Sequence, residues 1–417
     1  MRRNVFQIVT ILTAAVLLLS ACAPAATAPA PIVQTVVVEQ TKIVEGTPVK
    51  QEVVVTATAA PTKAVPTALP AGSVQITGSG ATFPLPIYTE WTYAYQYIDQ
   101  AVSINYQGIG SGGGKKAIID GTVDFAGSDS LVSDAEYTAG KDLQMYPMVA
   151  GAVVSIYNIK WNLPKAGEKT PTPAAPAAKL ILDGKTLVGI YNGTINKWND
   201  AAIVALNPDL ASVLPDAKIT VVHRSDGSGT TELFTKALTS FSPDWKAGGA
   251  SAVEWPVDKA GNGMGGKGNP GVAAGVINTP NSIGYVELAY AKSNGIAYAK
   301  MVNKAGKTVE ANAASLAAAM NDFADKFTDK LTNTIVDAPG AESWPIAGYT
   351  YLVLHTTSMK DCVKAQKLLE YIRWTLTDAS ASKRAADLGY SVLPAAVQKM
   401  VLDKLAKVTC NNQPVLK

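Results

Sequence analysis

The chain has 417 residues, which is enough for two domains and a large core at about 100–200 residues per domain. Charged residues make up 17% of the sequence, and the formal net charge is only +3, without a long run of Lys or Arg. Nothing in this balance indicates a surface that follows a nucleic-acid backbone, so we expect no nucleic-acid partner.

The first 21 residues have the pattern of an export signal. Two arginines precede an apolar run from Val5 to Leu19, which is shorter than the roughly 20 residues needed to span a bilayer. The run ends in Leu19-Ser20-Ala21-Cys22, which resembles the bacterial lipobox, whose cysteine becomes the lipidated first residue of the mature protein. We therefore predict a signal peptide over residues 1–21 and an extracytoplasmic lipoprotein, anchored to the cell membrane through Cys22. A secretory signal with a chance cysteine is the alternative.

Residues 22–73 differ in composition from the rest of the chain. They are rich in Ala, Pro, Thr and Val and contain no aromatic residue, so they have little to bury in a core. We predict a lipid-anchored flexible linker, in which the VVVEQTKIVEG and QEVVVT pieces have some β propensity. A second Pro- and Ala-rich stretch, residues 162–178, is predicted to be a surface insertion.

From Val74 onward, short apolar strands alternate with helical patterns. Strands are predicted at 74–77, 102–107, 123–129, 218–223 and 349–355, and helices at 86–98, 115–121, 231–241, 272–277 and 363–376. The repeated order of strand, turn and helix is typical of an α/β fold built on parallel sheets.

Three glycine-rich turns each come directly before a predicted helix. They cover residues 78–83, 108–114 and 225–230. A helix N-terminus presents unpaired backbone N–H groups and the positive end of the helix dipole, glycine lets an anion approach the backbone, and Ser or Thr adds hydroxyl donors. A single turn of this kind is more often only a capped helix start. Three of them in one chain indicate a compact tetrahedral oxyanion as the ligand.

Two charged residues next to these turns narrow the choice of anion. Arg224 precedes the third turn, and a guanidinium makes bidentate contacts with oxyanions. Asp129 would repel a fully ionised anion, but its carboxylate can accept a hydrogen bond from a protonated one. Inorganic phosphate carries such a proton at neutral pH and sulfate does not, so the two residues together favour phosphate. Taken singly, Asp129 is more often a helix cap and Arg224 a surface residue.

Seven stretches occur in an order that is typical of one family of binding proteins. They are GSGATFP, NYQGIGSGGG, VDFAGSD, LDGKTLVGIYNGTINKWND, HRSDGSGTTELF, GGKGNPGVAA and IGYVELAYAK. They resemble the signature stretches of the periplasmic-type phosphate-binding protein of the phosphate ABC importer, over roughly four-fifths of the chain from Val74 on.

The resemblance implies a two-lobed periplasmic-binding-protein-like fold, with hinge strands and a ligand cleft between two α/β lobes. Residues 74–149 plus 346–417 would form one lobe and residues 150–345 the other. The resemblance also implies that the protein is not an enzyme. It would bind inorganic phosphate outside the cytoplasmic membrane and deliver it to the ABC permease subunits of a phosphate importer. We further expect a monomer.

The resemblance assigns a ligand set as well. The residues that match the family's phosphate-contacting positions are Thr82, Phe83, Ser111, Asp129, Arg224, Ser228, Gly229 and Thr230. Asp226 matches the acid that pairs with the arginine and orients it. The sequence departs from the family in the insertion and at His223, where some relatives have a second basic residue. We expect His223 to be a partly exposed spectator.

Two cysteines lie near the C-terminus. In an oxidising compartment Cys362 and Cys410 could form a disulfide, or they could stay as two separate thiols. Their spacing alone leaves both possibilities open.

Two other classes of function compete with a binding protein. A phosphatase would need a nucleophile with its base or a metal cluster, but His223 and His355 are the only histidines and no metal-binding motif is present, so we expect no metal site and no cofactor. A nucleotide-binding module is suggested by Gly108-x-Gly110-x-x-Gly113, yet this pattern alone is weak and the Walker pattern is not met. Sulfate, molybdate and organic phosphates remain alternative ligands for the same kind of site.

Overall fold

The computed structural model describes residues 36–44, 47–55, 72–163 and 176–416. The predicted signal peptide, Cys22 and most of the 162–178 insertion lie outside the described residues. The chain divides into two compact units, Met1–Ala68 and Leu69–Lys417, and each is considered by itself.

The first unit contains a β-hairpin. Strand β1 (Val36–Val44) pairs antiparallel with β2 (Thr47–Val55), with Val36 opposite Val55. These strands are the two Val-rich pieces of the predicted linker. β-Branched residues favour extended backbone, so the local β propensity of these pieces is expressed as a paired hairpin.

The second unit is built on one mixed sheet of nine strands. Its strand order is β4-β3-β5-β13-β6-β10-β8-β9, and β14 pairs with β6 in addition. The bounds are β3 (Val74–Gly80), β4 (Val102–Gly108), β5 (Phe125–Ser128), β6 (Leu143–Asn158), β8 (Thr220–Arg224), β9 (Gly263–Gly266), β10 (Ser282–Glu287), β13 (Ala347–His355) and β14 (Ser391–Val392). Pairing is parallel among β3, β4 and β5 and among β8, β9 and β10, as the α/β pattern predicted. The pairs that join these two groups are antiparallel, because β6 and β13 run against their neighbours.

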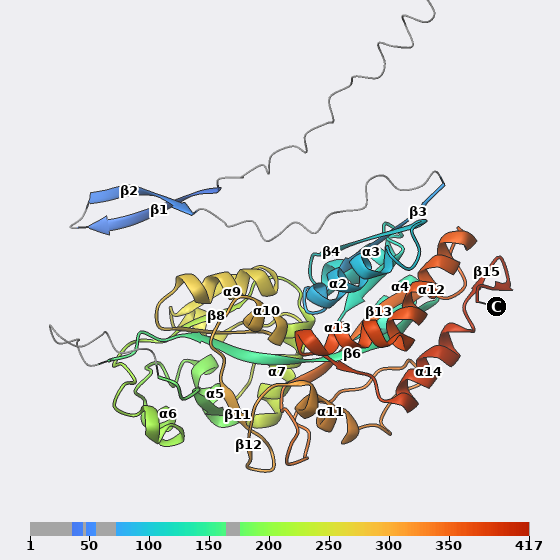
Figure 1. Ribbon diagram of the computed structural model, residues 1–417. Helices are drawn as coiled ribbons and strands as arrows, with labels where there is room; N and C mark the ends of the chain where they lie inside the picture. The colour runs from blue at the N-terminus through green and yellow to red at the C-terminus, as the bar shows by residue number, and fades with distance from the viewer. Residues whose placement is uncertain (1–35, 45–46, 56–71, 164–175, 417) are drawn as a thin grey trace, which may run out of the picture. The chain divides into compact units, whose positions relative to one another are not determined.

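Strand β6 runs through both parts of this sheet (Figure 1). Its residues 143–152 pair with β13, and residues 153–158 pair with β10. All but its last residue are buried. The fold is therefore two-lobed, with β6 as the strand that runs through both lobes. We propose residues 74–149 plus 346–417 as the first lobe and 150–345 as the second, which places their boundary inside β6.

Helices pack around each part of the sheet (Figure 1). Those of the first lobe are α2 (Leu85–Tyr95), α3 (Ser111–Ile119), α4 (Asp134–Gly140), α12 (Cys362–Thr377), α13 (Ala379–Leu388) and α14 (Ala395–Leu405). Those of the second lobe are α5 (Gly184–Asn192), α6 (Ala201–Leu206), η1 (Pro208–Leu210), α7 (Gly229–Phe241), α8 (Pro256–Lys259), α9 (Gly268–Asn278), α10 (Leu288–Ser293) and α11 (Ala313–Asn321). Small strands complete the fold: β7 (Ile181–Asp183), β11 (Lys300–Val302), β12 (Thr308–Val309), β15 (Thr409–Cys410) and β16 (Gln413–Pro414). Within the described ranges, every helix is too short or too polar to cross a bilayer.

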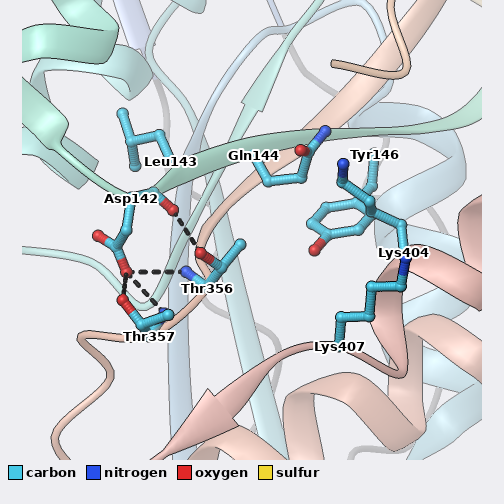
Figure 2. Close-up of a pocket in the computed structure, with 8 residues that line it drawn as sticks. All are labelled: Asp142, Leu143, Gln144, Tyr146, Thr356, Thr357, Lys404 and Lys407. Carbon is cyan, nitrogen blue, oxygen red and sulfur yellow. Dashed lines mark hydrogen bonds between the residues drawn. The ribbon is translucent and has the colours of Figure 1, made fainter. Parts of the chain in front are cut away.

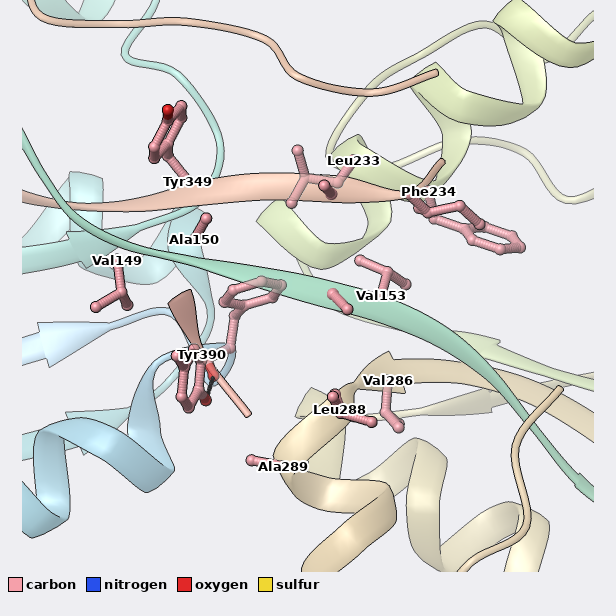
Figure 3. Packing of buried hydrophobic residues seen from close by; sticks show 14 of the residues in the cluster. Val149, Ala150, Val153, Leu233, Phe234, Val286, Leu288, Ala289, Tyr349 and Tyr390 are labelled. Atoms are coloured by element: carbon pink, nitrogen blue, oxygen red, sulfur yellow. Dashed lines mark hydrogen bonds between the residues drawn. The ribbon is translucent and has the colours of Figure 1, made fainter. Parts of the chain in front are cut away.

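The hydrophobic core continues from one lobe into the other (Figure 3). Ala150 and Val153 of β6 lie among residues of both lobes, with Phe234 of α7 on one side and Tyr390 on the other; all four are fully buried. Close approach of α7 to β13 requires Gly348, since a Cβ there would lie 2.2 Å from a methyl carbon of Leu233. The lobes are thus packed on a common apolar centre.

A disulfide joins the start of α12 to β15. It links Cys362 with Cys410, whose Cα atoms are 5.5 Å apart, across a sequence separation of 48 residues. Of the two possibilities that the sequence left open, the structure has the bonded pair. Cross-linking the chain in this way reduces the conformational freedom of the unfolded state.

We predict that the double change Cys362→Ser/Cys410→Ser lowers the free energy of unfolding by about 2–4 kcal/mol, the usual effect of losing a loop-closing disulfide. Urea denaturation of both proteins at one pH measures the difference. Wild-type protein treated with a reductant should show the same loss. Equal stability of the variant and the oxidised wild type would contradict the prediction.

Candidate functional site

The three glycine-rich turns lie at the ends of β3, β4 and β8, where α2, α3 and α7 begin. Two of their glycines cannot be replaced without strain. Gly80 has φ 143° and a Cβ there would lie 2.1 Å from the carbonyl oxygen of Gly127, while Gly110 has φ 90°. The first and second turns are therefore packed closely against neighbouring groups.

Helix starts from the two lobes meet directly. Ser111, the first residue of α3, accepts a hydrogen bond on Oγ from the N–H of Gly229, the first residue of α7, at 3.1 Å. The N–H of Gly112 donates to the carbonyl of Gly227 at 3.2 Å. Ser111 is 1% exposed. The second and third turns, far apart in sequence, thus meet between the proposed lobes. We call this meeting point, where Ser111 and Gly112 contact Gly227 and Gly229, the junction.

Asp129 lies at this junction with its carboxylate buried. It is 3% exposed, and its Oδ1 accepts a hydrogen bond from the hydroxyl of Thr350 at 3.1 Å. A Cβ on Gly229 would be 2.5 Å from Asp129 Oδ2, so the carboxylate lies directly against the start of α7. Burial raises the pKa of Asp129 to about 7, although Thr350 and the charge of Arg224 act to lower it.

Arg224 is fixed by a bidentate ion pair with Asp226. Its Nε donates to Asp226 Oδ1 at 2.7 Å and its Nη2 donates to Oδ2 at 2.6 Å, with the arginine side chain 1% exposed. Burial acts to raise the pKa of Asp226, but the hydrogen bonds and charge of Arg224 hold it below its usual value. The remaining nitrogen, Nη1, points toward Thr230 Oγ1 at 3.4 Å. The predicted pairing of these two residues is present in the structure.

The other predicted residues have different local roles. Ser228 is fully buried and caps α7, accepting on Oγ from the N–H of Thr231 at 3.0 Å. The ring of Phe83 is buried in the core, and its carbonyl accepts from the hydroxyl of Tyr390 at 2.7 Å. Thr82 and Thr230 are 4% and 1% exposed, and both hydroxyls contact Asn269. All nine predicted residues therefore lie in or beside the junction.

Asn269 was missed by the sequence analysis. It lies at the second position of α9, is fully buried, and donates from Nδ2 to Thr82 Oγ1 at 3.0 Å and to Thr230 Oγ1 at 3.1 Å. The GGKGNPG stretch that contains it was among those carrying the resemblance. The helix predicted there began only at residue 272, so Asn269 fell outside it, whereas α9 begins at Gly268.

The expectation for His223 is wrong. The residue is buried, 5% exposed, with Nε2 2.9 Å from Asp258 Oδ1 and Nδ1 3.1 Å from the carbonyl of Arg224. Its ring stacks on Trp255 at 4.9 Å between centroids. Neighbouring side chains of β8 point to opposite faces of the sheet, so His223 faces away from Arg224, and Trp255 and Asp258 cover it there. His223 supports the far side of the strand that carries Arg224.

A separate polar network surrounds Asp142 in the first lobe (Figure 2). Its carboxylate accepts backbone N–H groups of Thr356, Thr357 and Ser358, and it lies 2.7 Å from His355 Nδ1. Despite partial burial, these hydrogen bonds hold the pKa of Asp142 well below its usual range. Both histidines of the chain are thus engaged away from the junction, in structural contacts.

This arrangement can bind an anion by directed hydrogen bonds. Its donors are backbone N–H groups at helix starts, hydroxyls and one guanidinium, and Asp129 supplies an acceptor. Among the described residues, no cluster of His, Cys, Asp and Glu is suited to hold a metal ion.

Comparisons with known proteins show the family and the fold of this chain. Residues 56–379 match the model of a PBP superfamily domain. The phosphate-binding protein PstS of Xylella fastidiosa (strain 9a5c) is 38% identical over 339 residues, 81% of this chain and 86% of the relative.

Solved structures share the fold. A phosphate-binding protein from Stenotrophomonas maltophilia superposes with a TM-score of 0.57 at 22% identity, covering 82% of this chain and 97% of the other. A high-affinity periplasmic phosphate-binding protein (PfluDING) bound with phosphate gives a TM-score of 0.61 at 21% identity, covering 79% and 93%.

A second buried carboxyl group lies behind the junction. Glu287 is fully buried, and its Oε2 contacts the N–H of Ala289 and the hydroxyl of Tyr390, each at 2.8 Å. The Tyr390 hydroxyl has one hydrogen, and it also lies 2.7 Å from the carbonyl of Phe83. A neutral Glu287 that donates to Tyr390 satisfies both contacts. Burial raises the pKa of Glu287 well above its usual value, in agreement with the neutral form.

We predict that Glu287→Gln removes a fall in stability that begins as pH rises above about 4.3, the usual pKa of a glutamate in an unfolded chain. Because the folded protein binds this proton more tightly than the unfolded chain, the free energy of unfolding of the wild type should decrease as pH rises above about 4.3, by up to about 1.4 kcal/mol per pH unit. Urea denaturation across this range measures the slopes. Glu254→Gln, at a side chain that is 89% exposed, is the control. Parallel curves for wild type and Glu287→Gln would refute the prediction.

Proposed function

We propose that this chain, which belongs to the PBP superfamily and within it to the phosphate-binding proteins of ABC importers, binds inorganic phosphate outside the cytoplasmic membrane and delivers it to an ABC permease. The observation that carries the proposal is the buried carboxyl of Asp129 beside the helix start at Gly229. A site of donors alone would suit any oxyanion, whereas an acceptor among the donors suits one that carries a proton.

The proposed ligands are the residues assigned by the resemblance. Backbone N–H groups of the first turn, the Ser111 hydroxyl and the start of α7 would donate to phosphate oxygens, and Arg224 would add charge through Nη1. Asp226 would orient the arginine. The proposed phosphate-contacting set is Thr82, Phe83, Ser111, Asp129, Arg224, Ser228, Gly229 and Thr230. Support comes from their burial at one junction between the lobes.

Selectivity against sulfate would come from Asp129. Facing an unprotonated sulfate oxygen, an ionised carboxylate repels it and neither partner supplies a hydrogen. Unpaired buried polar groups cost about 1–3 kcal/mol, more when charged, so an ionised Asp129 would disfavour sulfate, and this effect would weaken below about pH 7, where the carboxyl takes up a proton. Phosphate at neutral pH supplies the missing hydrogen itself.

We predict that Asp129→Asn reduces phosphate affinity modestly and reduces the difference between the affinities for phosphate and for sulfate, since an amide can donate where the carboxylate only accepts. Because the pKa of Asp129 is about 7, lowering the pH from 8 to 6 should raise sulfate affinity of the wild type by about tenfold and leave that of the variant unchanged.

Calorimetric titration of phosphate-free protein with phosphate, arsenate, sulfate and a phosphate ester tests both the function and the prediction. Asp209→Asn makes the same chemical change at an exposed position and should behave as the wild type. Failure of the wild type to bind phosphate would refute the proposed function. Equal sulfate rejection by wild type and Asp129→Asn would instead remove Asp129 as the selectivity element.

We also propose that the protein acts without catalysing a reaction, as a monomer attached to the membrane by a lipid on Cys22. The first part is supported by the engagement of His223 and His355 in structural hydrogen bonds. The anchor is supported by the sequence before Cys22, which lies outside the described residues.

We predict that Cys22→Ser abolishes lipidation and releases the protein from membranes, while phosphate affinity stays unchanged. Mass spectrometry of the mature wild-type N-terminus and fractionation of cells expressing either form measure this. A wild-type protein without lipid on Cys22 would rule the anchor out.

A further inference from the structure

We propose that Asn269 is a positioning residue that makes the hydroxyls of Thr82 and Thr230 obligate donors toward the bound anion, one from each lobe. The proposal rests on the proposed function and adds a residue outside the assigned ligand set. Asn269 is fully buried at the start of α9, between the two threonines.

The orientation of the Asn269 amide is determined by its third partner. The side-chain oxygen, Oδ1, accepts a hydrogen bond from the backbone N–H of Glu287 at 3.0 Å. A backbone N–H can only donate, so the atom facing it must be the oxygen, and the NH₂ group must face the threonines. Both amide hydrogens are thereby directed at Thr82 Oγ1 and Thr230 Oγ1.

Each threonine hydroxyl has its acceptor capacity filled. Thr82 Oγ1 accepts from the backbone N–H of Asn269 at 3.0 Å as well as from Nδ2. Thr230 Oγ1 accepts from Asn269 Nδ2 and from Arg224 Nη1. A hydroxyl has two lone pairs and one hydrogen, so only the hydrogen of each remains to be used. A phosphate oxygen is the kind of group that accepts it.

The same amide joins the lobes. Thr82 belongs to the first lobe, whereas Thr230 and Asn269 belong to the second. Asp226 helps to fix the position of Asn269, because the N–H of the preceding residue, Gly268, donates to Asp226 Oδ1 at 2.9 Å. The two threonine hydroxyls can therefore donate together only when the lobes are closed on each other.

A double-mutant cycle distinguishes this role from general support of the fold. We compare Asn269→Ala in the wild type and in a Thr82→Val/Thr230→Val background, by calorimetric titration with inorganic phosphate. We expect Asn269→Ala to weaken binding roughly tenfold or more in the wild type and less than about threefold in the background, since it acts through the removed hydroxyls. Asn278→Ala, an exposed asparagine at the other end of α9, should have no effect.

A nearly isosteric variant guards against a failure of Asn269→Ala to fold. Asn269→Asp keeps an oxygen toward the N–H of Glu287 but replaces the NH₂ group with a second oxygen, which only accepts. The hydroxyls of Thr82 and Thr230 would then donate to this oxygen instead of to phosphate, so phosphate affinity should fall below that of Asn269→Ala. If the wild type binds phosphate, either of two results would overturn the proposal. One is an unchanged phosphate affinity of Asn269→Asp, and the other is an equal loss of affinity from Asn269→Ala in both backgrounds. Absence of binding by the wild type would overturn the proposed function together with this inference.

Discussion

The ion pair between Arg224 and Asp226 is the interaction on which the junction depends. A buried guanidinium is costly unless its charge and hydrogens are matched, and the bidentate contact does both while leaving Nη1 directed inward. The same carboxylate binds the N–H of Gly268 and so determines where α9 begins. It also lies so near Gly110 that a Cβ there would be 2.5 Å from Oδ2. One side chain thus sets the positions of a strand end, a helix start and a turn of the opposite lobe.

Around this neutralised pair, the electrostatics of the junction are governed by carboxyl groups whose charge depends on pH. Asp129 has a pKa of about 7, so it is poised between accepting and donating near neutrality. Glu287 lies deeper, and burial raises its pKa well above the usual value. Backbone N–H groups and hydroxyls supply the remaining polarity, and they keep their donor character at any pH. Under the proposed function, the contribution of these donors to anion binding would not depend on pH, whereas the contribution of Asp129 would.

Local patterns in the sequence predicted the elements well, and tertiary contacts explain what was missed. Short apolar runs located β3, β8 and β13, which lie within the sheet, and helical periodicity located α7 and α12, which each bury one face. The burial of His223 depends on Trp255 and Asp258 packing against β8, and local sequence does not show that contact. The position of Asn269 likewise depends on Thr82, which is 187 residues away. The bond between Cys362 and Cys410 required knowledge that α12 and β15 lie side by side.

The pairing of β13 has a consequence for how the protein is made. This strand lies between β5 and β6, which precede it by about 190–220 residues, and it pairs with both. During synthesis from the N-terminus, β5 and β6 therefore emerge long before the strand that joins them. The second lobe lies between β6 and β13 in the sequence, so it is complete before β13 emerges. Its strand β10 can then pair with residues 153–158 of β6. The first lobe must wait, with an unpaired apolar edge exposed, until β13 is available, which makes it the more vulnerable to aggregation while the chain is incomplete.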